Sequence, residues 1–347
     1  MEKMQVLVVI PTLNEAEHIE ATIVALHQAI PDKADILFVV VDGGSTDGTQ
    51  AIVQQLKDCN FPNLRLLHNP KRLQSAAVNL AVRQFGAPYK VLVRCDAHSV
   101  YPPGFIRDLV ASLDEHVADA VVVPMDSIGD TPLRKAIAWV SDTPVGSGGS
   151  AHRGGRQSGF VDHGHHAAFR MASFCRAGGY DESFSHNEDA ELDCRQRALG
   201  SRIFLDANIR IGYYARPTLR SLWKQYSAYG SGRSRTVRRH PGSLRARQLA
   251  VPVHVALSTG ALVAAPWVPW LLAWPLLYLA VLLGTSAALG IKHRNLAAAL
   301  AAPAAFVMHT AWAIGFFRGM LAFREEAWTE KNAEPLALSG SSVAGGA

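Results

Sequence analysis

The C-terminal part of the chain contains a long run without charge, and this feature most constrains the fold. Residues 249–291 include no Lys, Arg, Asp or Glu. A helix that crosses a bilayer needs about 20 apolar residues, so the run is long enough for two helices that turn near the sequence PWVPW. A third apolar run, 296–317, again has spanning length. The sequence therefore predicts about three transmembrane helices over 249–317.

Basic residues predict how these helices are oriented. The segment 232–248 is strongly basic, and KHR follows the second predicted helix at 292–294. Cytoplasmic loops carry an excess of Lys and Arg, so both segments are expected in the cytoplasm and the third helix would end outside. Residues 318–347 are expected to form an interfacial segment and a disordered tail. No signal-peptide pattern precedes the N-terminal domain, which is therefore expected to be cytoplasmic.

Charge and cysteine content exclude several classes of function. The net charge of +5 is concentrated beside the apolar runs, so it suits anionic lipid headgroups, and no nucleic-acid partner is expected. The four cysteines have no CxxC spacing, so neither a zinc site nor a disulfide framework is expected. A transporter is also disfavoured, because the three apolar runs carry no charged residue that would move a substrate.

The N-terminal half alternates between strand and helix patterns. Strands are predicted at 6–10, 35–42, 64–69 and 90–96, with amphipathic helical segments between them. This alternation predicts an α/β fold, with a parallel sheet covered by helices. In such sheets ligands bind at the carboxyl ends of the strands. Those ends carry the sequences PTLNE, VDGGSTDGT, HNPKR and CDAH, so the functional site is expected there.

Two of these strand ends have chemistry of their own. In VDGGSTDGT, Gly43 and Gly44 permit a sharp turn before a helix, which suits a phosphate group, although a well-capped turn without a ligand has the same pattern. In CDAH, Asp96 and His98 are two residues apart on an extended backbone, so both can reach one metal ion. The alternative for CDAH is the start of a solvated loop.

Further candidates lie later in the chain. Asp189 follows Glu188 at the start of a helical pattern and can act as a base, or these acids only cap the helix. Three histidines, His163, His165 and His166, can bind a metal or form polar pocket walls. The glycine-rich, basic loop 146–160 is expected to be either a plain surface loop or a lid whose Arg153 and Arg156 meet a diphosphate.

Four motifs resemble those of the family-two inverting glycosyltransferases, in the order and spacing of that family. They are VVIPTLNEAEHI, VVVDGGSTDGT, RCDAH and NEDAELDCR. The family has the GT-A fold, a Rossmann-like nucleotide-sugar domain, and the resemblance covers roughly residues 5–235. The DAH variant, the sequence QYSAYGSGRSR and the apolar C-terminal part are similar to the membrane glucosyltransferases of succinoglycan biosynthesis.

The resemblance implies a role for residues on the nucleotide side of the site. Pro11, Asn14 and Glu15 would line the nucleotide pocket. Asp42 would bind the uracil or ribose of the donor, and Asp47 would support that loop.

It also implies the catalytic and diphosphate-binding residues. Asp96 would lie near the donor diphosphate and its divalent ion. Asp189 would be the general base, with Glu188 beside it. Gln225 and Arg233 would lie near the donor phosphates or cover the site, although the usual Gln-x-x-Arg-Trp is absent. That absence also disfavours a processive synthase.

One departure from the family concerns the metal. The family's Asp-x-Asp is Asp-Ala-His here, so Asp96 and His98 are the candidate ligands. The ion would be Mn²⁺ or Mg²⁺, and a histidine ligand suits Mn²⁺ better. The alternative is that His98 only donates a hydrogen bond to a phosphate.

The resemblance thus predicts domains, substrates and location. The domains are a cytoplasmic GT-A domain over 1–235, a basic juxtamembrane segment over 236–248 and the transmembrane helices over 249–317. Residues 318–347 would form the interfacial segment and the disordered tail. The enzyme would transfer a hexose, expected to be glucose from UDP-glucose, to a polyprenyl-diphosphate-linked saccharide in exopolysaccharide biosynthesis.

It would be a multi-pass protein of the bacterial inner membrane, with other polysaccharide-assembly proteins as partners. One alternative is a transferase to polyprenyl phosphate. The other is a non-catalytic nucleotide-sugar-binding subunit of a polysaccharide assembly complex, suggested by the missing second acid of the metal motif.

Overall fold

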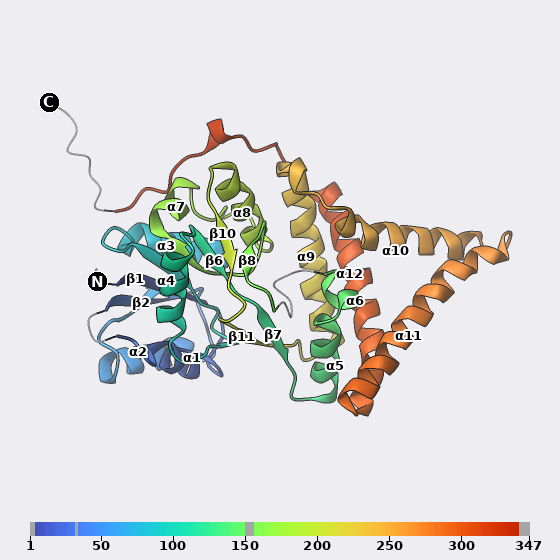
Figure 1. The fold of residues 1–347 in the computed structure, drawn as a ribbon, viewed down its shortest axis with the longest axis horizontal. Coiled ribbons are helices and arrows are strands. Elements are labelled where there is room, and N and C mark those ends of the chain that lie inside the picture. The colour runs from blue at the N-terminus through green and yellow to red at the C-terminus, as the bar shows by residue number, and fades with distance from the viewer. Residues whose placement is uncertain (1–3, 32–33, 150–155, 340–347) are drawn as a thin grey trace. The chain divides into compact units, whose positions relative to one another are not determined.

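The computed structural model describes residues 4–31, 34–149 and 156–339 (Figure 1). The chain forms two compact units. Unit 1 comprises residues 1–125, 155–212 and 329–347, and unit 2 comprises residues 126–154 and 213–328.

Unit 1 is built on an eight-stranded mixed sheet with the strand order β3-β2-β1-β4-β9-β6-β10-β8. The strands are β1 (Gln5–Thr12), β2 (Asp35–Asp42), β3 (Leu64–His68), β4 (Val91–Arg94), β6 (Ala120–Val122), β8 (Gly159–Phe160), β9 (His166–Arg170) and β10 (Ile203–Leu205). Strands β1 to β4 are parallel, as the alternating pattern predicts. Strand β9 runs antiparallel to both β4 and β6, a reversal that the alternation in the first half does not predict.

Helices cover both faces of this sheet (Figure 1). They are α1 (Ile19–His27), α2 (Thr49–Cys59), α3 (Gln74–Phe85), α4 (Phe105–Glu115), α7 (Met171–Arg176) and α8 (Glu188–Ala198). Because both faces of the sheet are covered, the strand β1 is apolar at successive positions, and Val6 to Ile10 are fully buried. A second sheet has the order β5 (Ser99–Val100), β11 (Ile211–Tyr214) and β7 (Met125–Ile128), and the boundary between the units passes through β7 and β11.

The parallel register brings the predicted loops to one edge of the sheet. Thr12 on β1 pairs with Asp42 on β2, which in turn pairs with His68 on β3. Val9 on β1 pairs with Arg94, the last residue of β4. The loops that follow β1, β2 and β4 therefore open at the same edge, where an open α/β sheet binds its ligand.

Unit 2 is helical, apart from the strand ends it shares with the second sheet. Its helices are α5 (Pro132–Ser141), α6 (Pro144–Ser147), α9 (Leu219–Arg239), α10 (Ala246–Ala264), α11 (Ala273–His293) and α12 (Ala301–Ala322). Short 3-10 helices lie at Pro241–Ser243, Pro269–Leu272 and Leu296–Leu300. Helices α9 and α12 approach closely through glycines: a Cβ at Gly230 or at Gly315 would collide with the backbone of the opposite helix.

Two segments of the described chain, Pro269–His293 and Leu296–Ala322, are helices long and apolar enough to cross a membrane. The amino-acid sequence predicts about three such helices. The first predicted helix corresponds to α10, and its polar residues Arg247, Gln248 and His254 make it less apolar than the other two.

The C-terminal segment differs from the predicted disordered tail. A 3-10 helix at Glu330–Asn332 precedes it, and Leu336 and Leu338 then pack against the core of unit 1. The Leu336 N–H donates to the Cys175 carbonyl (2.8 Å), and the Ser339 N–H donates to the Arg83 carbonyl (2.7 Å). We call residues 334–339 the C-terminal strap. The predicted tail beyond it, residues 340–347, lies outside the described residues.

This packing predicts that the strap stabilises unit 1. Leu336→Ala should lower the free energy of unfolding by about 1–2 kcal/mol, because it removes a half-buried side chain from the core surface. The measurement is the thermal unfolding midpoint in detergent, with Ala337→Ser, a change at an exposed neighbour, as the matched control. An unchanged midpoint for Leu336→Ala would show that the strap does not contribute.

Candidate active site

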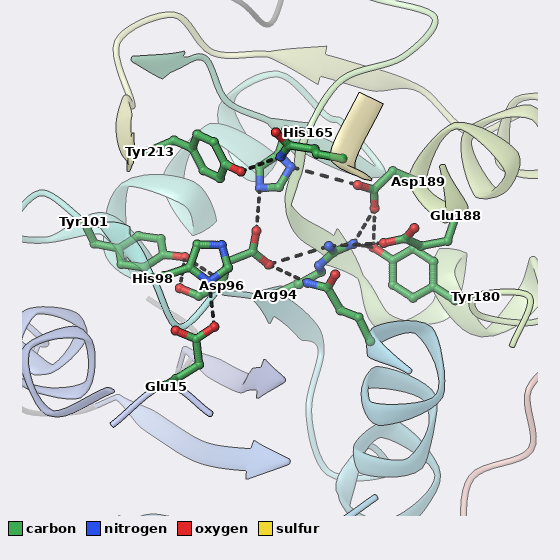
Figure 2. Close-up of polar contacts among 12 residues, drawn as sticks. Glu15, Arg94, Asp96, His98, Tyr101, His165, Tyr180, Glu188, Asp189 and Tyr213 are labelled. Carbon is green, nitrogen blue, oxygen red and sulfur yellow. Dashed lines mark hydrogen bonds and ion pairs between the residues drawn. The ribbon is translucent and has the colours of Figure 1, made fainter. Parts of the chain in front are cut away.

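A buried arginine lies at the centre of a cluster of carboxylates in unit 1 (Figure 2). Arg94 ends strand β4 and is only 5 % exposed. Its Nη1 lies 2.5 Å from Oδ1 of Asp189, and its Nη2 lies 3.4 Å from Oε1 of Glu188 and 3.6 Å from Oδ1 of Asp96. One guanidinium therefore joins the end of β4 to the start of α8.

The charge balance of this cluster explains why an arginine is tolerated inside the domain. Burial alone would lower the pKa of Arg94, but Asp189, Asp96 and Glu188 raise it well above its usual value, so the guanidinium stays charged. A buried charge without a partner is very costly, whereas carboxylates on two sides compensate it. The single positive charge of Arg94 faces three carboxyl groups. The resulting excess of negative charge affects the pKa values of these groups.

Asp96 and Glu188 respond to the cluster in opposite directions. Burial would raise the pKa of Asp96, but Arg94, His165, His98 and the Gln74 amide lower it to about 2, so Asp96 is ionised. Burial and the neighbouring charge of Asp189 raise the pKa of Glu188 to about 7, even though Arg94 opposes them. At neutral pH Asp96 therefore stays ionised, whereas the carboxyl group of Glu188 is close to its pKa.

Asp189 is fixed by its position at the start of α8. Asn187, the N-cap residue before Glu188, has a left-handed φ of 67°, and Asp189 is the second residue of the helix. Oδ1 of Asp189 accepts hydrogen bonds from Arg94 and from the Tyr180 hydroxyl (3.0 Å). Oδ2 faces Nδ1 of His165 at 3.9 Å. One oxygen is thus held by two donors, and the other points toward the histidine.

His165 lies between the two aspartates. Its Nε2 is 3.6 Å from Oδ2 of Asp96, and its Nδ1 is on the side of Asp189 (Figure 2). His163, by contrast, contacts Asp193 (Nδ1 to Oδ2, 2.5 Å). The side chain of His166 and the predicted lid residues 150–155, which include Arg153, lie outside the described residues.

A pocket beside this cluster contains four of the predicted site residues. Pro11, Glu15, Asp96 and His98 line it, together with residues of the loops after β2 and β3 and the start of α3. Nδ1 of His98 lies 2.9 Å from Oε1 of Glu15, so the loops after β1 and β4 are joined across the pocket.

Asn14, Asp42 and Asp47 make contacts that hold loops. Asn14 Oδ1 accepts from the N–H of Thr46 (2.9 Å). Asp47 Oδ2 accepts from the N–H of Ala16 (3.0 Å). Both contacts join the loop after β1 to the loop after β2. Their predicted roles toward a nucleotide remain predictions.

The carboxylate of Asp42 supports its own turn. Oδ2 accepts from the N–H groups of Gly44 (2.7 Å) and Ser45 (2.9 Å) and from the Gln50 amide (2.7 Å). Gly44 has a φ of +86°, which requires glycine at this point of the turn. Asp42 is 1 % exposed, and the adjacent Val41 and Gly43 line the pocket.

The donor set fits a divalent ion that shares its coordination with a substrate. Asp96 and His98 line the same pocket and offer an oxygen and a nitrogen ligand. In the described part of the chain, no group of three or more His, Cys, Asp and Glu side chains is arranged to hold an ion alone. Ions that bind substrate phosphates commonly use only one or two protein ligands, so this pair is sufficient.

The remaining predicted residues, Gln225 and Arg233, lie on α9 in unit 2. Gln225 contacts the hydroxyls of Tyr213 (2.7 Å) and Tyr229 (2.9 Å), and Arg233 donates to the Ser243 carbonyl (3.0 Å). Their proximity to donor phosphates stays a prediction.

Three further residues of the site, Arg94, Gln74 and Tyr180, are not among those predicted from the sequence. Arg94 had a detectable signal, because it is the one charge at the end of an otherwise apolar strand. Gln74 donates to Asp96 (2.6 Å) from the first residue of α3, and Tyr180 donates to Asp189 from a loop. Neither has a local sequence pattern that distinguishes it.

Comparisons with known proteins agree on one family. A family model described as glycosyl transferase family 2 matches residues 7–176. The chain is 44 % identical over 321 residues to the succinoglycan biosynthesis protein ExoA of Rhizobium meliloti, covering 92 % of this chain and 96 % of that protein. It is 32 % identical over 145 residues to an undecaprenyl-phosphate mannosyltransferase of Micrococcus luteus, covering 39 % of this chain and 56 % of that protein.

A solved structure confirms the predicted fold class. The mannosyltransferase from Pyrobaculum calidifontis, in complex with GDP-Man and Mn²⁺, matches with a TM-score of 0.62 at 21 % identity, over 93 % of this chain and 89 % of that one.

The raised pKa of Glu188 predicts a pH-dependent stability. The ordinary Glu pKa is 4.5 and the folded value is about 7, so the folded state binds more protons between these values, and wild-type stability falls as pH rises through them. Glu188→Gln removes the titrating carboxyl and with it this loss of stability. The unfolding midpoint of the variant minus that of wild type should therefore be about 3–6 °C larger at pH 8 than at pH 5.

The matched control is Glu182→Gln. Lys71, Arg83 and Asn79 hold the pKa of Glu182 below its usual value, although burial opposes them, so this residue titrates below pH 5. The difference between Glu182→Gln and wild type should stay constant over the same range. A constant difference for Glu188→Gln as well would contradict the charge balance described above.

Proposed function

Because the chain belongs to glycosyl transferase family 2, we propose that this glycosyltransferase moves a hexose, glucose from UDP-glucose, to a polyprenyl-diphosphate-linked saccharide with inversion at the anomeric carbon. The observation that carries the proposal is the Arg94 bridge. The guanidinium of Arg94 contacts both the ionised Asp96, which lines the pocket, and Asp189. Donor activation and acceptor activation are thereby held in one rigid frame.

Asp189 acts as the general base in this proposal. Arg94 and Tyr180 hold its Oδ1, so Oδ2 takes the proton of the acceptor hydroxyl. The acceptor oxygen forms its bond to the anomeric carbon while the bond from that carbon to the donor diphosphate breaks. The diphosphate leaves with the electron pair, and the proton remains on Asp189. A single displacement of this kind inverts the anomeric carbon.

Asp96 and His98 hold the divalent ion in this proposal, and Glu15 orients His98 through the 2.9 Å contact. When bound, Mn²⁺ or Mg²⁺ supplies positive charge to the departing diphosphate. The low pKa of Asp96 keeps this ligand ionised throughout the physiological range. Pro11 lines the same pocket, and the turn held by Asp42 borders it, which supports the proposed roles of both residues at the nucleotide.

The substrates are proposed from the relatives. The protein with 44 % identity over 92 % of this chain is named for succinoglycan biosynthesis, which supports a lipid-linked saccharide of exopolysaccharide assembly as acceptor. A polyprenyl phosphate acceptor is the second candidate, because the chain also resembles an undecaprenyl-phosphate mannosyltransferase over part of its length. We place the enzyme at the bacterial inner membrane with unit 1 on the cytoplasmic side, where nucleotide sugars are made, and propose other polysaccharide-assembly proteins as partners.

Donor turnover tests the proposal. The purified protein in nanodiscs receives UDP- and GDP-sugars, a bacterial lipid extract and Mn²⁺ or Mg²⁺. Transfer of one sugar to lipid is expected, together with its loss on chelation. Asp189→Asn should lower kcat by about 10²–10⁴-fold, because the acceptor hydroxyl loses its base. Asp58→Asn, the same change at an exposed position of α2, should leave kcat unchanged.

Each other outcome removes a separate part of the proposal. Donor binding without transfer to any lipid would favour the non-catalytic binding subunit. Transfer to polyprenyl phosphate alone would select the second candidate. Full activity in Asp189→Asn would leave the enzyme standing and contradict the base assignment.

A further inference from the structure

The C-terminal strap fixes how many times the chain can cross a membrane. The chain leaves unit 1 at residue 212 and is part of unit 1 again from residue 329. Leu336 and Leu338 pack on the unit 1 core, so residue 329 lies on the same side of any membrane as unit 1. The number of crossings between these points must therefore be even. Three transmembrane helices over 249–317 are incompatible with this packing.

Of the three predicted transmembrane helices, α12 is the one whose packing argues against a membrane crossing. It runs alongside α9 and parallel to it: Gly315 contacts Ser227, and one turn later Gly319 contacts Ser234. Arg238 of α9 then donates to the Gly319 carbonyl (2.8 Å). If α12 crossed a membrane, α9 would cross with it. Helix α9 carries too many cations for this, namely Arg220, Lys224, Arg233, Arg235, Arg238 and Arg239.

Other contacts keep the C-terminal end and the middle of α12 on the side of α9. Beyond its C-terminal end, Glu325 is buried and pairs with Arg239 of α9 (2.8 Å). In its middle, His309 contacts the Val145 carbonyl of α6 (2.7 Å). Consistent with this, 44 % of the apolar stretch of α12 is buried within the protein, compared with 11 % of that of α11.

Helices α10 and α11 have the opposite character. Their apolar side chains point outward, and several are more than half exposed, among them Leu257, Leu262, Leu276 and Leu277. The two helices meet at the turn that contains Trp267 and Trp270, which are 78 % and 74 % exposed (Figure 1). An exposed apolar surface of this extent requires a covering, and residues 249–291 of the hairpin carry no charged side chain.

Length and charge indicate that a lipid bilayer provides this covering. Helices of 19 and 21 residues are about 28 and 31 Å long, which matches a hydrocarbon core of about 30 Å. Arg245 and Arg247 lie at the start of α10, and Lys292 and Arg294 lie at the end of α11, where anionic headgroups would be found. Tryptophan at the tip suits the amphipathic far interface.

We propose that the α10–α11 hairpin alone inserts into the bilayer, tryptophan turn first, while α12 and both chain termini stay on the side of unit 1. The proposal rests on the membrane attachment in the proposed function, and it differs from the sequence prediction of three spans with an outside end for the third helix.

Reporter fusions to the full chain test the even number of crossings. A fluorescent protein that folds only in the cytoplasm, fused after Ala347, should fluoresce, and alkaline phosphatase fused there should be inactive. The reverse pattern would overturn the proposal, because three crossings place the C-terminus outside. The same reporters inserted after Asn295 within the full chain serve as the control, since the hairpin and the three-span arrangement both place this residue inside.

Brominated phospholipids test insertion directly. In vesicles that contain only the full-length protein, brominated acyl chains should quench tryptophan fluorescence. Trp267→Phe/Trp270→Phe should lose at least about half of this quenching, and Trp139→Phe, in α5, should retain it. Equal quenching in both variants, or none in wild type, would show that something other than lipid covers the hairpin. These readouts need no transferase activity, so a failure of the catalytic proposal remains distinguishable.

Discussion

The buried charge of Arg94 is the constraint on which the site depends. A guanidinium inside an α/β domain is tolerated only if carboxylates lie within contact distance, and Asp96, Glu188 and Asp189 meet this need from two elements far apart in the sequence. Because the arginine ends β4 and two of the acids begin α8, its compensation fixes the helix against the parallel part of the sheet. The same contacts that satisfy the charge therefore set the geometry between the pocket and Asp189.

The charge balance also separates the acids chemically. Asp96 is held ionised, with a pKa of about 2, whereas Glu188, with a pKa of about 7, readily takes up a proton and so reduces the excess negative charge. An ionised carboxylate beside the pocket suits a metal and a diphosphate. A neighbour that is readily protonated lets Asp189 share Arg94 without three full negative charges in one buried site. Thus burial and a single cation divide the roles among the acids.

The α/β class and the site edge could be predicted from the sequence, because the period of apolar residues and the polar strand ends are local signals. Asp96 and His98 were proposed from such a strand end and Glu15 from the family resemblance, and the structure brings all three to one pocket. Arg94, Gln74 and Tyr180 were missed because their function arises from contacts across elements. The membrane topology that we propose for α12 likewise depends on contacts across elements. Composition gives α12 a spanning length, but only its packing on α9 and the strap at Leu336 show that the chain must return to unit 1.

The most direct test of the account is a double-mutant cycle between Arg94→Met and Asp189→Asn, read as unfolding midpoints in detergent and converted to free energy. The account predicts a coupling of at least about 1 kcal/mol, because Asp189 is an uncompensated buried charge once Arg94 is gone, and neutralising it should then be far less costly than in wild type. Additive effects of the two substitutions would show that Arg94 does not hold Asp189 and would contradict the central claim.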